Sequence, residues 1–150
     1  MKLEQAIKQY KFASREQRLG LNIIFSFNWL REKQKAYFVN YGITSQQYNV
    51  LRILRGNFPN AYSTSDIRER MLDKMSDASR IVDRLVKKKL VERTTNKEDK
   101  RLVDIKISDE GLALLEKMDN TIEVHAQSPF KNLTSDEQYK LDELLDKMRA

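Results

Sequence analysis

Apolar side chains recur every three or four residues along most of this chain, which is the spacing of amphipathic helices. Residues 1–13 are mixed in character, with Leu3, Ile7 and Tyr10 at helical spacing. Beyond them the pattern predicts one long helix and three shorter ones, over about residues 14–40, 44–55, 63–71 and 76–88. The first 90 residues are therefore expected to be almost entirely helical.

Several of these helices begin with a capping signal, a Ser or Thr followed three residues later by Gln, Asp or Glu. The two side chains of such a pair can each accept a hydrogen bond from a backbone amide of the other residue. The pairs are Ser14 with Gln17, Thr44 with Gln47, Ser63 with Asp66, and Thr134 with Glu137. Gly42 can end the long helix, because glycine adopts the left-handed conformation freely. The polar stretch 56–60 predicts a loop.

The spacing changes from helical to alternating near residue 90. Residues 91–94 and 103–107 alternate apolar and polar side chains, which predicts two half-buried strands. The charged stretch 95–101 between them predicts the tip of a hairpin. We therefore expect a mainly α fold (α+β) in which a single small β-hairpin follows the fourth helix of the first half.

Two more helices are predicted after the hairpin. The first begins at Ser108 and carries apolar residues in register up to Ile122, and Ser128–Pro129 breaks it. The second follows Thr134 and carries a stripe of Leu141, Leu144, Leu145 and Met148. No repeat, low-complexity segment or long linker divides the chain, so residues 1–150 are expected to form one domain.

Composition narrows the range of chemistry. The absence of Cys excludes disulfides, thiol catalysis and thiol redox sensing, and a single His excludes a multi-His metal site. The sequence has no glycine-rich phosphate loop and no grouping of nucleophile, base and orienting residue, so it does not favour an enzyme, a metal site or a cofactor. It also has no signal-peptide core and no membrane-length apolar run, and we expect a cytoplasmic protein.

Charge is distributed unevenly along the chain, whose total net charge is +6. Residues 74–106, which contain the fourth helix and the hairpin, carry 11 basic and 6 acidic side chains, whereas residues 107–150 carry 5 basic and 10 acidic ones. A basic middle next to an acidic end indicates one face that could meet a polyanion. Charge alone does not separate that interpretation from an ordinary solvated surface.

The short helix over residues 63–71 and the amphipathic helix after it have the order of a helix-turn-helix motif. In that motif the second helix lies in the major groove and offers outward residues to bases near its N-terminus and to phosphates further along. The residues on that face are Ser76, Asp77, Ser79 and Arg80, followed by Arg84 and Lys87. Taken alone, such a helix is more often an ordinary amphipathic helix with a solvated charged face.

The hairpin makes the nucleic-acid interpretation more specific. Its tip carries Lys97, Lys100 and Arg101. An Arg on an extended tip can enter a narrow minor groove, where the negative potential of DNA is strongest. A simple solvated turn would carry similar residues, so it is the combination of helix and hairpin that favours DNA binding.

Four segments resemble the MarR family of winged helix-turn-helix regulators, in the same order and at matching spacing. They are Ile43–Leu51 at the start of the first core helix, Val82–Arg93 over the recognition helix and first wing strand, Asp99–Lys100–Arg101 at the wing tip, and Ile107–Gly111 after the wing. Lys89 departs from the pattern, because the family usually has Gly at that place. A left-handed Lys there would cost about 1 kcal/mol relative to Gly.

The resemblance implies a homodimer that binds a pseudo-palindromic operator on double-stranded DNA, commonly as a repressor. About residues 1–40 and 109–150 would form the dimerisation helices, and about residues 44–107 the winged DNA-binding lobe. Asp99 would orient Arg101 or bond a helix residue such as Arg84, and Arg101 would reach the minor groove. An intramolecular helical cap is the alternative to dimerisation.

The resemblance also implies a small-molecule effector, anionic or aromatic, bound between the dimerisation helices and the winged lobe. The candidate pocket residues are Trp29, Tyr37, Phe38 and Tyr41, with Arg52 or Arg55 as anion partner. Plain core packing explains the aromatic residues as well. The alternative function is a winged-helix module for protein contacts or non-specific DNA binding, although Asp77 and Asp83 on the recognition helix would oppose purely electrostatic binding.

Overall fold

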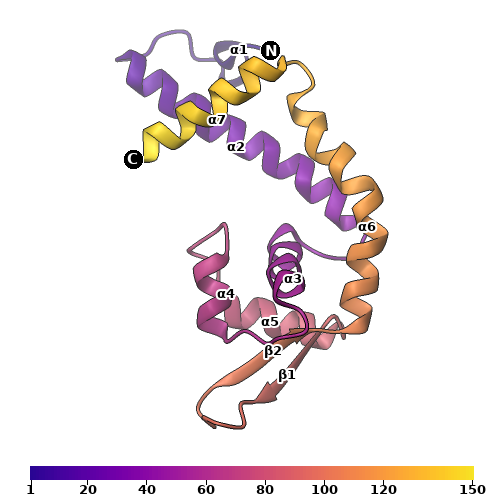
Figure 1. Cartoon of the computed structure of the whole chain (residues 1–150). Coiled ribbons are helices and arrows are strands. Elements are labelled where there is room, and N and C mark those ends of the chain that lie inside the picture. The colour runs from indigo at the N-terminus through magenta and orange to yellow at the C-terminus, as the bar shows by residue number, and fades with distance from the viewer. The chain divides into compact units, whose positions relative to one another are not determined.

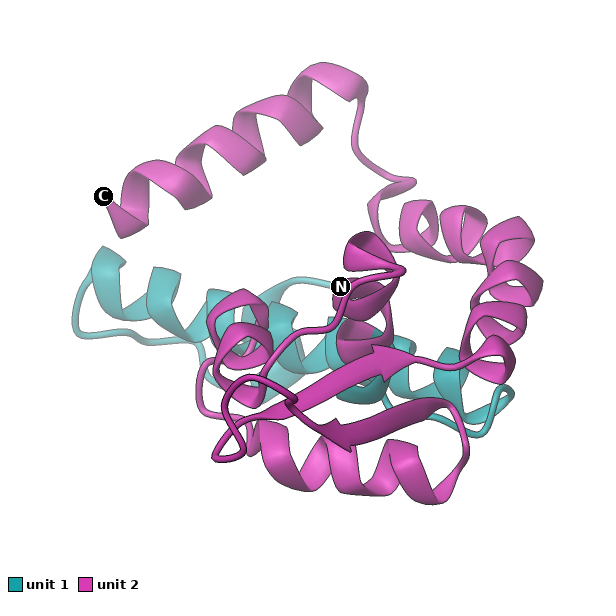
Figure 2. Ribbon diagram, turned by 60° about the horizontal axis from the view of Figure 1, so that its bottom comes forward, with its two compact units in different colours: residues 1–48 teal, residues 49–150 magenta.

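The computed structural model describes all residues from Met1 to Ala150 (Figure 1). It contains seven α-helices, one short 3-10 helix and one hairpin. The elements in chain order are α1 (Leu3–Ile7), α2 (Arg15–Val39), α3 (Ser45–Asn57), α4 (Thr64–Arg70), α5 (Ala78–Lys87), β1 (Val91–Thr95), β2 (Val103–Ile107), α6 (Asp109–Gln127), η1 (Ser128–Phe130) and α7 (Ser135–Arg149). The predicted mainly α fold with one hairpin is confirmed. The chain forms two compact units, residues 1–48 and 49–150, drawn in two colours in Figure 2.

The first unit contains α1, α2 and the start of α3. Ser14 caps α2 by accepting a hydrogen bond from the Gln17 amide at 3.1 Å, as predicted. The short helix α1 ends at Lys8 in the left-handed conformation, so Tyr10 lies beyond it and is 73% exposed. The helix α2 runs for 25 residues with Phe38 as its one buried residue. Five of its large apolar side chains are exposed, namely Leu19, Ile24, Phe27, Trp29 and Val39.

The second unit contains the helix-turn-helix motif and its core. The core is built from side chains that are almost fully buried in α3, α4, α5, β2 and α6: Leu51, Leu54, Ile67, Leu85, Ile105, Leu115 and Met118. The helix α3 begins behind a reciprocal cap between Thr44 and Gln47, with both hydrogen bonds at 3.1 Å. Its last turn includes Gly56 and Asn57, which the sequence assigned to a loop. Glycine and asparagine are common at helix ends, so their position does not by itself mark the boundary.

The hairpin pairs β1 with β2 in antiparallel register, from Val91 opposite Ile107 to Thr95 opposite Val103. The inward side chains Val91, Ile105 and Ile107 are buried, which is the predicted alternation. A third segment joins at one point, because Tyr62 exchanges two backbone hydrogen bonds with Ile105 at 3.0 and 2.9 Å. The middle of β2 is thus tied to the connection between α3 and α4.

The two C-terminal helices differ in burial. The helix α6 is capped by Ser108, whose hydroxyl accepts a hydrogen bond from the Gly111 amide at 3.0 Å, and it buries Leu115 and Met118. The helix α7 has the predicted Thr134 cap but no buried residue. No helix of the chain is both long and apolar enough to cross a bilayer.

Candidate nucleic-acid interface

The helix α5 has one buried and one exposed face. Ala78, Val82 and Leu85 are at most 1% exposed and pack into the core of the second unit. The opposite face carries four of the residues expected to meet DNA: Ser79, Arg80, Arg84 and Lys87. This face therefore presents two guanidinium groups, an ammonium group and a hydroxyl to solvent.

The predicted N-cap of α5 was wrong by one residue. The helix begins at Ala78, and Asp77 is its N-cap, with a carboxylate oxygen that accepts a hydrogen bond from the Arg80 amide at 3.1 Å. Ser76 lies in the preceding turn, where its amide donates to the Asp73 carbonyl at 3.2 Å. Both Ser and Asp are good N-caps, so the sequence alone did not separate them. Asp77 thus has a structural role at a position where a base contact was expected.

An ion pair joins α5 to the first strand of the hairpin. The Arg93 guanidinium donates a hydrogen bond to the carboxylate of Asp83, ten residues earlier in the chain. The carboxylate of Asp83 is therefore neutralised locally, and it does not stand as a free negative charge on the recognition face. Sequence reasoning missed Arg93, although its outward position in the alternating strand was a usable signal.

The tip of the hairpin is an ordered turn organised by Asn96. The Asn96 carboxamide oxygen accepts from the amides of Glu98 and Asp99 at 2.9 and 2.8 Å, and its nitrogen donates to Asp104 at 2.9 Å. The Leu102 amide donates to the Asp99 carbonyl at 2.9 Å and closes the turn. The tip therefore holds its shape through short-range hydrogen bonds.

Arg101 is held on this tip by Asp99. The carboxylate of Asp99 accepts hydrogen bonds from the Arg101 backbone amide, Nε and Nη2, each at 3.0 Å. The Arg101 guanidinium keeps the pKa of the Asp99 carboxyl below its ordinary value, and the pKa of Arg101 is raised by the same bond. The side chain of Arg101 is nevertheless 90% exposed. The structure thus has the pairing of Asp99 with Arg101, the first of the two arrangements expected for Asp99.

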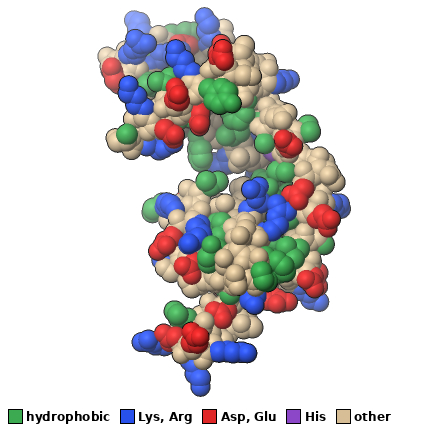
Figure 3. All heavy atoms as spheres, viewed as in Figure 1, with side chains coloured by type: hydrophobic (Ala, Val, Ile, Leu, Met, Phe, Trp, Pro, Cys, Tyr) green, Lys and Arg blue, Asp and Glu red, His purple; other side chains and the backbone are tan.

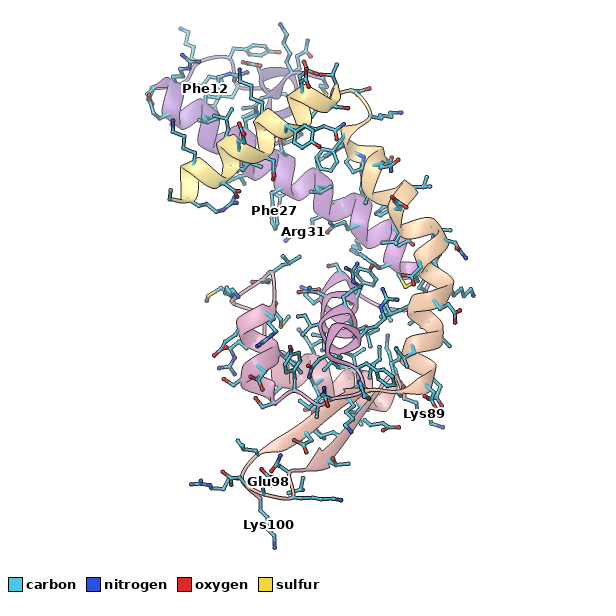
Figure 4. The ribbon with its side chains drawn as sticks, in the orientation of Figure 1. Phe12, Phe27, Arg31, Lys89, Glu98 and Lys100 are labelled. Carbon is cyan, nitrogen blue, oxygen red and sulfur yellow. The ribbon has the colours of Figure 1, made fainter.

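The surroundings of Arg101 are mixed in charge. Lys97 and Lys100 are exposed, and so is Glu98. Figure 4 labels Glu98 and Lys100 at the outermost part of the hairpin, with Lys100 pointing away from the body of the unit. Figure 3 shows Lys and Arg side chains projecting around the same end. The three cations expected at the tip are therefore all available to solvent, and two carboxylates lie among them, the exposed Glu98 and Asp99, which bonds Arg101.

The backbone at Lys89 has the left-handed conformation that the sequence suggested for this position. Its φ is 60°, and the Lys89 carbonyl accepts a hydrogen bond from the Ser108 hydroxyl at 2.7 Å. The Ser108 amide donates to the Leu90 carbonyl at 3.1 Å. The turn after α5 is thus fastened to the start of α6, and Lys89 adopts a conformation that glycine would take without strain.

Three of the four aromatic residues expected in an effector pocket form a cluster in the first unit. The ring of Tyr37 packs 5.2 Å from both Phe38 and Tyr41, and Phe38 lies 4.8 Å from Tyr48. Phe38 is only 4% exposed. The sequence did not assign Tyr48 to this cluster. Its position four residues after Thr44, in the first turn of the next helix, was the available signal.

The remaining pocket candidates have different surroundings. Trp29, earlier on α2, is 44% exposed, and the Lys33 ammonium lies 5.1 Å from its ring centroid. In the second unit, Arg55 donates two hydrogen bonds to Asp119, so its charge is matched within the chain. Arg52 is exposed. No group of three or more His, Asp or Glu residues could hold a metal ion.

Comparisons with known proteins agree with this arrangement. The profile of the MarR family matches residues 41–102, from the end of α2 to the wing tip. The chain is 28% identical to the regulator PapX of Escherichia coli over 72% of its own length and 66% of PapX. It is 39% identical to the repressor MdtR of Bacillus subtilis over 47% of its length and 44% of MdtR. The matches thus span two thirds or less of these curated relatives.

A solved structure matches over nearly the whole chain. It is a mutant of MarR from Escherichia coli complexed with operator DNA, 28% identical, with a TM-score of 0.79 and 99% of each chain covered. The structural similarity therefore includes the terminal helices as well as the segment that the family profile matches.

Proposed function

Because the chain belongs to the MarR family, whose members are transcriptional regulators and not enzymes, we propose that it binds a specific operator in double-stranded DNA and regulates transcription there. In this proposal α5 enters the major groove and the hairpin forms the wing, with its tip in the adjacent minor groove. Arg80 and Ser79 would contact base edges, and Arg84 and Lys87 would contact phosphates.

The observation that carries this proposal is the position of Arg101. The ordered turn and three hydrogen bonds to Asp99 hold the backbone and side chain of Arg101 in one position. The side chain is nevertheless 90% exposed. A guanidinium placed in this way loses little conformational freedom when it enters a groove lined with phosphates. The DNA complex of the MarR relative supports the same use of this fold.

We also propose that the protein acts as a homodimer through the terminal helices, about residues 1–40 and 109–150. Large apolar side chains stay exposed on α2, among them Ile24 at 59% and Phe27 at 58%. The apolar stripe of α7 is exposed to a similar degree, since the exposed fraction is 54% for both Leu144 and Met148. Covering one such side chain is worth about 1.5–3 kcal/mol, so a second copy of the chain is the expected cover.

A homodimer with two-fold symmetry would read two half-sites about one helical turn apart, ~10 bp, so the operator would be pseudo-palindromic. Repression is the proposed mode, in line with the repressor MdtR among the relatives. An anionic or aromatic effector would alter operator affinity by favouring one spacing of the two recognition helices. The aromatic residues around Tyr37 are the proposed contacts for such an effector.

Selection from a pool of random duplexes tests the proposal. The protein is titrated against the pool, and the bound fraction is recovered and sequenced. The expected result is enrichment of one palindromic sequence, bound by the wild type with a steep dependence on salt. Binding that shows no enrichment and disappears as salt rises would contradict sequence-specific regulation.

The alternative is a non-specific or protein-binding winged helix. One observation favours it to a degree: Asp77 caps α5 and Asp83 is paired with Arg93, so neither acid repels phosphates as strongly as a free carboxylate would. Competition with random DNA at one salt concentration separates the two functions. A specific regulator keeps its operator under at least a 1,000-fold excess of random competitor, on the order of known specificity ratios.

A further inference from the structure

The turn between α4 and α5 exposes two large apolar side chains. Leu72 is 88% exposed and Met75 is 93% exposed, and no other apolar residue except Met1 is exposed to this degree. Figure 1 shows the turn as the loop that joins the two helices of the helix-turn-helix motif. Both side chains are therefore open to contact with an occupant of this surface.

The exposure of these residues does not come from a loose loop. The Leu72 amide donates to the Asn49 carboxamide oxygen at 3.0 Å. The Met75 amide donates to the Asp73 carboxylate at 3.0 Å, and the turn then enters the Asp77 cap of α5. Hydrogen bonds therefore hold the turn at both ends, and the Met75 side chain is presented outward from a fixed backbone.

The charge around the turn favours a polyanion as the occupant. Residues 68–88 contain seven basic and four acidic side chains. Three of the acids are already engaged, since Asp73 bonds the Met75 amide, Asp77 caps α5 and Asp83 pairs with Arg93. The exposed methionine thus lies in a surface whose net charge is positive. Such a surface attracts the phosphates of DNA, so DNA is the expected partner.

Met75 also lies at the end of α5 that would enter the groove. Two residues separate it from the Asp77 cap, so the two Cα atoms are within about 7 Å of each other. The 5-methyl group of thymine is the one apolar feature that base pairs present in the major groove. A thioether with three rotatable bonds can follow such a methyl group closely.

We infer that Met75 is a specificity-determining residue that contacts a thymine methyl group in the operator and so makes the protein prefer a T·A pair at that position. Leu72, which is three residues further from the cap, does not make this contact. The inference rests on the proposed function, because it needs a specific operator to act on.

The test uses the full chain and the operator obtained by selection. Each thymine is replaced in turn by uracil, symmetrically in both half-sites, which removes only the methyl group. At one position the substitution is expected to weaken wild-type binding by roughly 4- to 15-fold, the value of one or two lost methyl contacts. The M75A variant is expected to bind the original operator more weakly by a similar factor and to be insensitive to uracil at that position.

Two further variants serve as controls. M75L keeps an apolar side chain and should restore most of the sensitivity to uracil, whereas L72A changes an equally exposed residue of the same turn and should behave like the wild type. Because both positions are almost fully exposed, circular dichroism and thermal unfolding of all three variants should match the wild type.

The outcomes separate this inference from the proposed function. A specific operator on which M75A stays as sensitive to every uracil as the wild type overturns the inference and leaves the regulator intact. Loss of sensitivity in L72A instead of M75A overturns the assignment to Met75. Failure to select any operator overturns the proposed function and this inference together.

Discussion

Arg55 of α3 and Asp119 of α6 form a two-pronged ion pair across 64 positions of sequence. The Arg55 Nη1 and Nη2 atoms lie 2.8 and 3.1 Å from the two carboxylate oxygens of Asp119. The side chains are 30% and 49% exposed, so solvent screens the pair in part. The pair fixes the side of α6 against the helix that opens the DNA-binding lobe, and it uses the fork of the guanidinium in full.

Replacing Arg55 by Lys should weaken this contact, because an ammonium group cannot make two parallel hydrogen bonds to one carboxylate. We expect the R55K and D119N variants each to lower the free energy of unfolding, with a coupling of about 0.5–1 kcal/mol in a double-mutant cycle. Urea denaturation of the four proteins measures it. R52K is the matched control, and a coupling of zero would mean that the pair contributes nothing to stability.

Arg101 on the wing should be a major contributor to operator affinity. We expect R101A to weaken binding by about 10- to 100-fold at moderate salt, because the exposed guanidinium is the proposed minor-groove contact. A titration of the selected operator measures the change. K140A removes the same charge from α7 and should bind like the wild type. Equal affinity of R101A and wild type would remove Arg101 from the interface.

Asp99 should titrate below the ordinary range for an aspartate. Its pKa is lowered chiefly by the side-chain hydrogen bond from Arg101, so the bond stabilises the folded state above the unfolded pKa of about 3.9 and is lost as the pH falls through the lower folded value. Carbon-detected NMR on the free protein measures the titration. The R101A variant should move the Asp99 pKa upward, and an unchanged pKa would show that the bond does not persist in solution.

Gly111 should not tolerate a side chain. A Cβ atom there would lie 2.3 Å from the Leu90 carbonyl oxygen and 2.7 Å from Ile107, and the first of these contacts is with backbone. We expect G111A to lower the free energy of unfolding by about 1–3 kcal/mol despite the better helix propensity of alanine. G56A, in the last turn of α3 with nothing within 4 Å, should be neutral or slightly stabilising. Equal stability of the two variants would contradict the close packing at Gly111.

Lys89 should be replaceable by glycine with a gain in stability. Its φ of 60° is strained for any residue with a Cβ atom, so K89G should raise the free energy of unfolding by about 1 kcal/mol. K88G removes the same charge at a neighbour with right-handed backbone, φ −82°, and should lower stability. Thermal unfolding of both variants measures the difference, and a loss of stability in K89G would mean that the lysine side chain compensates for its backbone.

Local signals in the sequence predicted most of the fold. The Ser63–Asp66 and Thr134–Glu137 pairs identified helix starts because a capping box is made by residues that are three positions apart. The strands were found for a similar reason, since alternation reports directly which side chains face the core. The start of α5 was missed because Ser76 and Asp77 are both competent caps, and only the turn geometry decides between them.

The long-range contacts were beyond the reach of these signals. The pairing of Arg55 with Asp119 depends on how two helices pack, and any of several basic residues on α3 could have faced α6. The contact between Tyr62 and Ile105 is a single residue pair, too short to leave an alternating pattern of its own. Among the interface residues, the sequence identified the cations of the wing tip but not Arg93, whose role follows from the proximity of β1 to α5.

The single bridge at Tyr62 has a mechanical consequence for the hairpin. Tyr62 holds the hairpin at Ile105, in the middle of β2, and the strand continues only to Val103 before the turn that carries Arg101. The tip has no such bridge of its own, so a rotation of the hairpin about Tyr62 moves the tip more than the residues at the bridge. Small changes in the packing around Tyr62 would therefore shift the position of Arg101. A residue that does not contact DNA can in this way determine where Arg101 meets the minor groove.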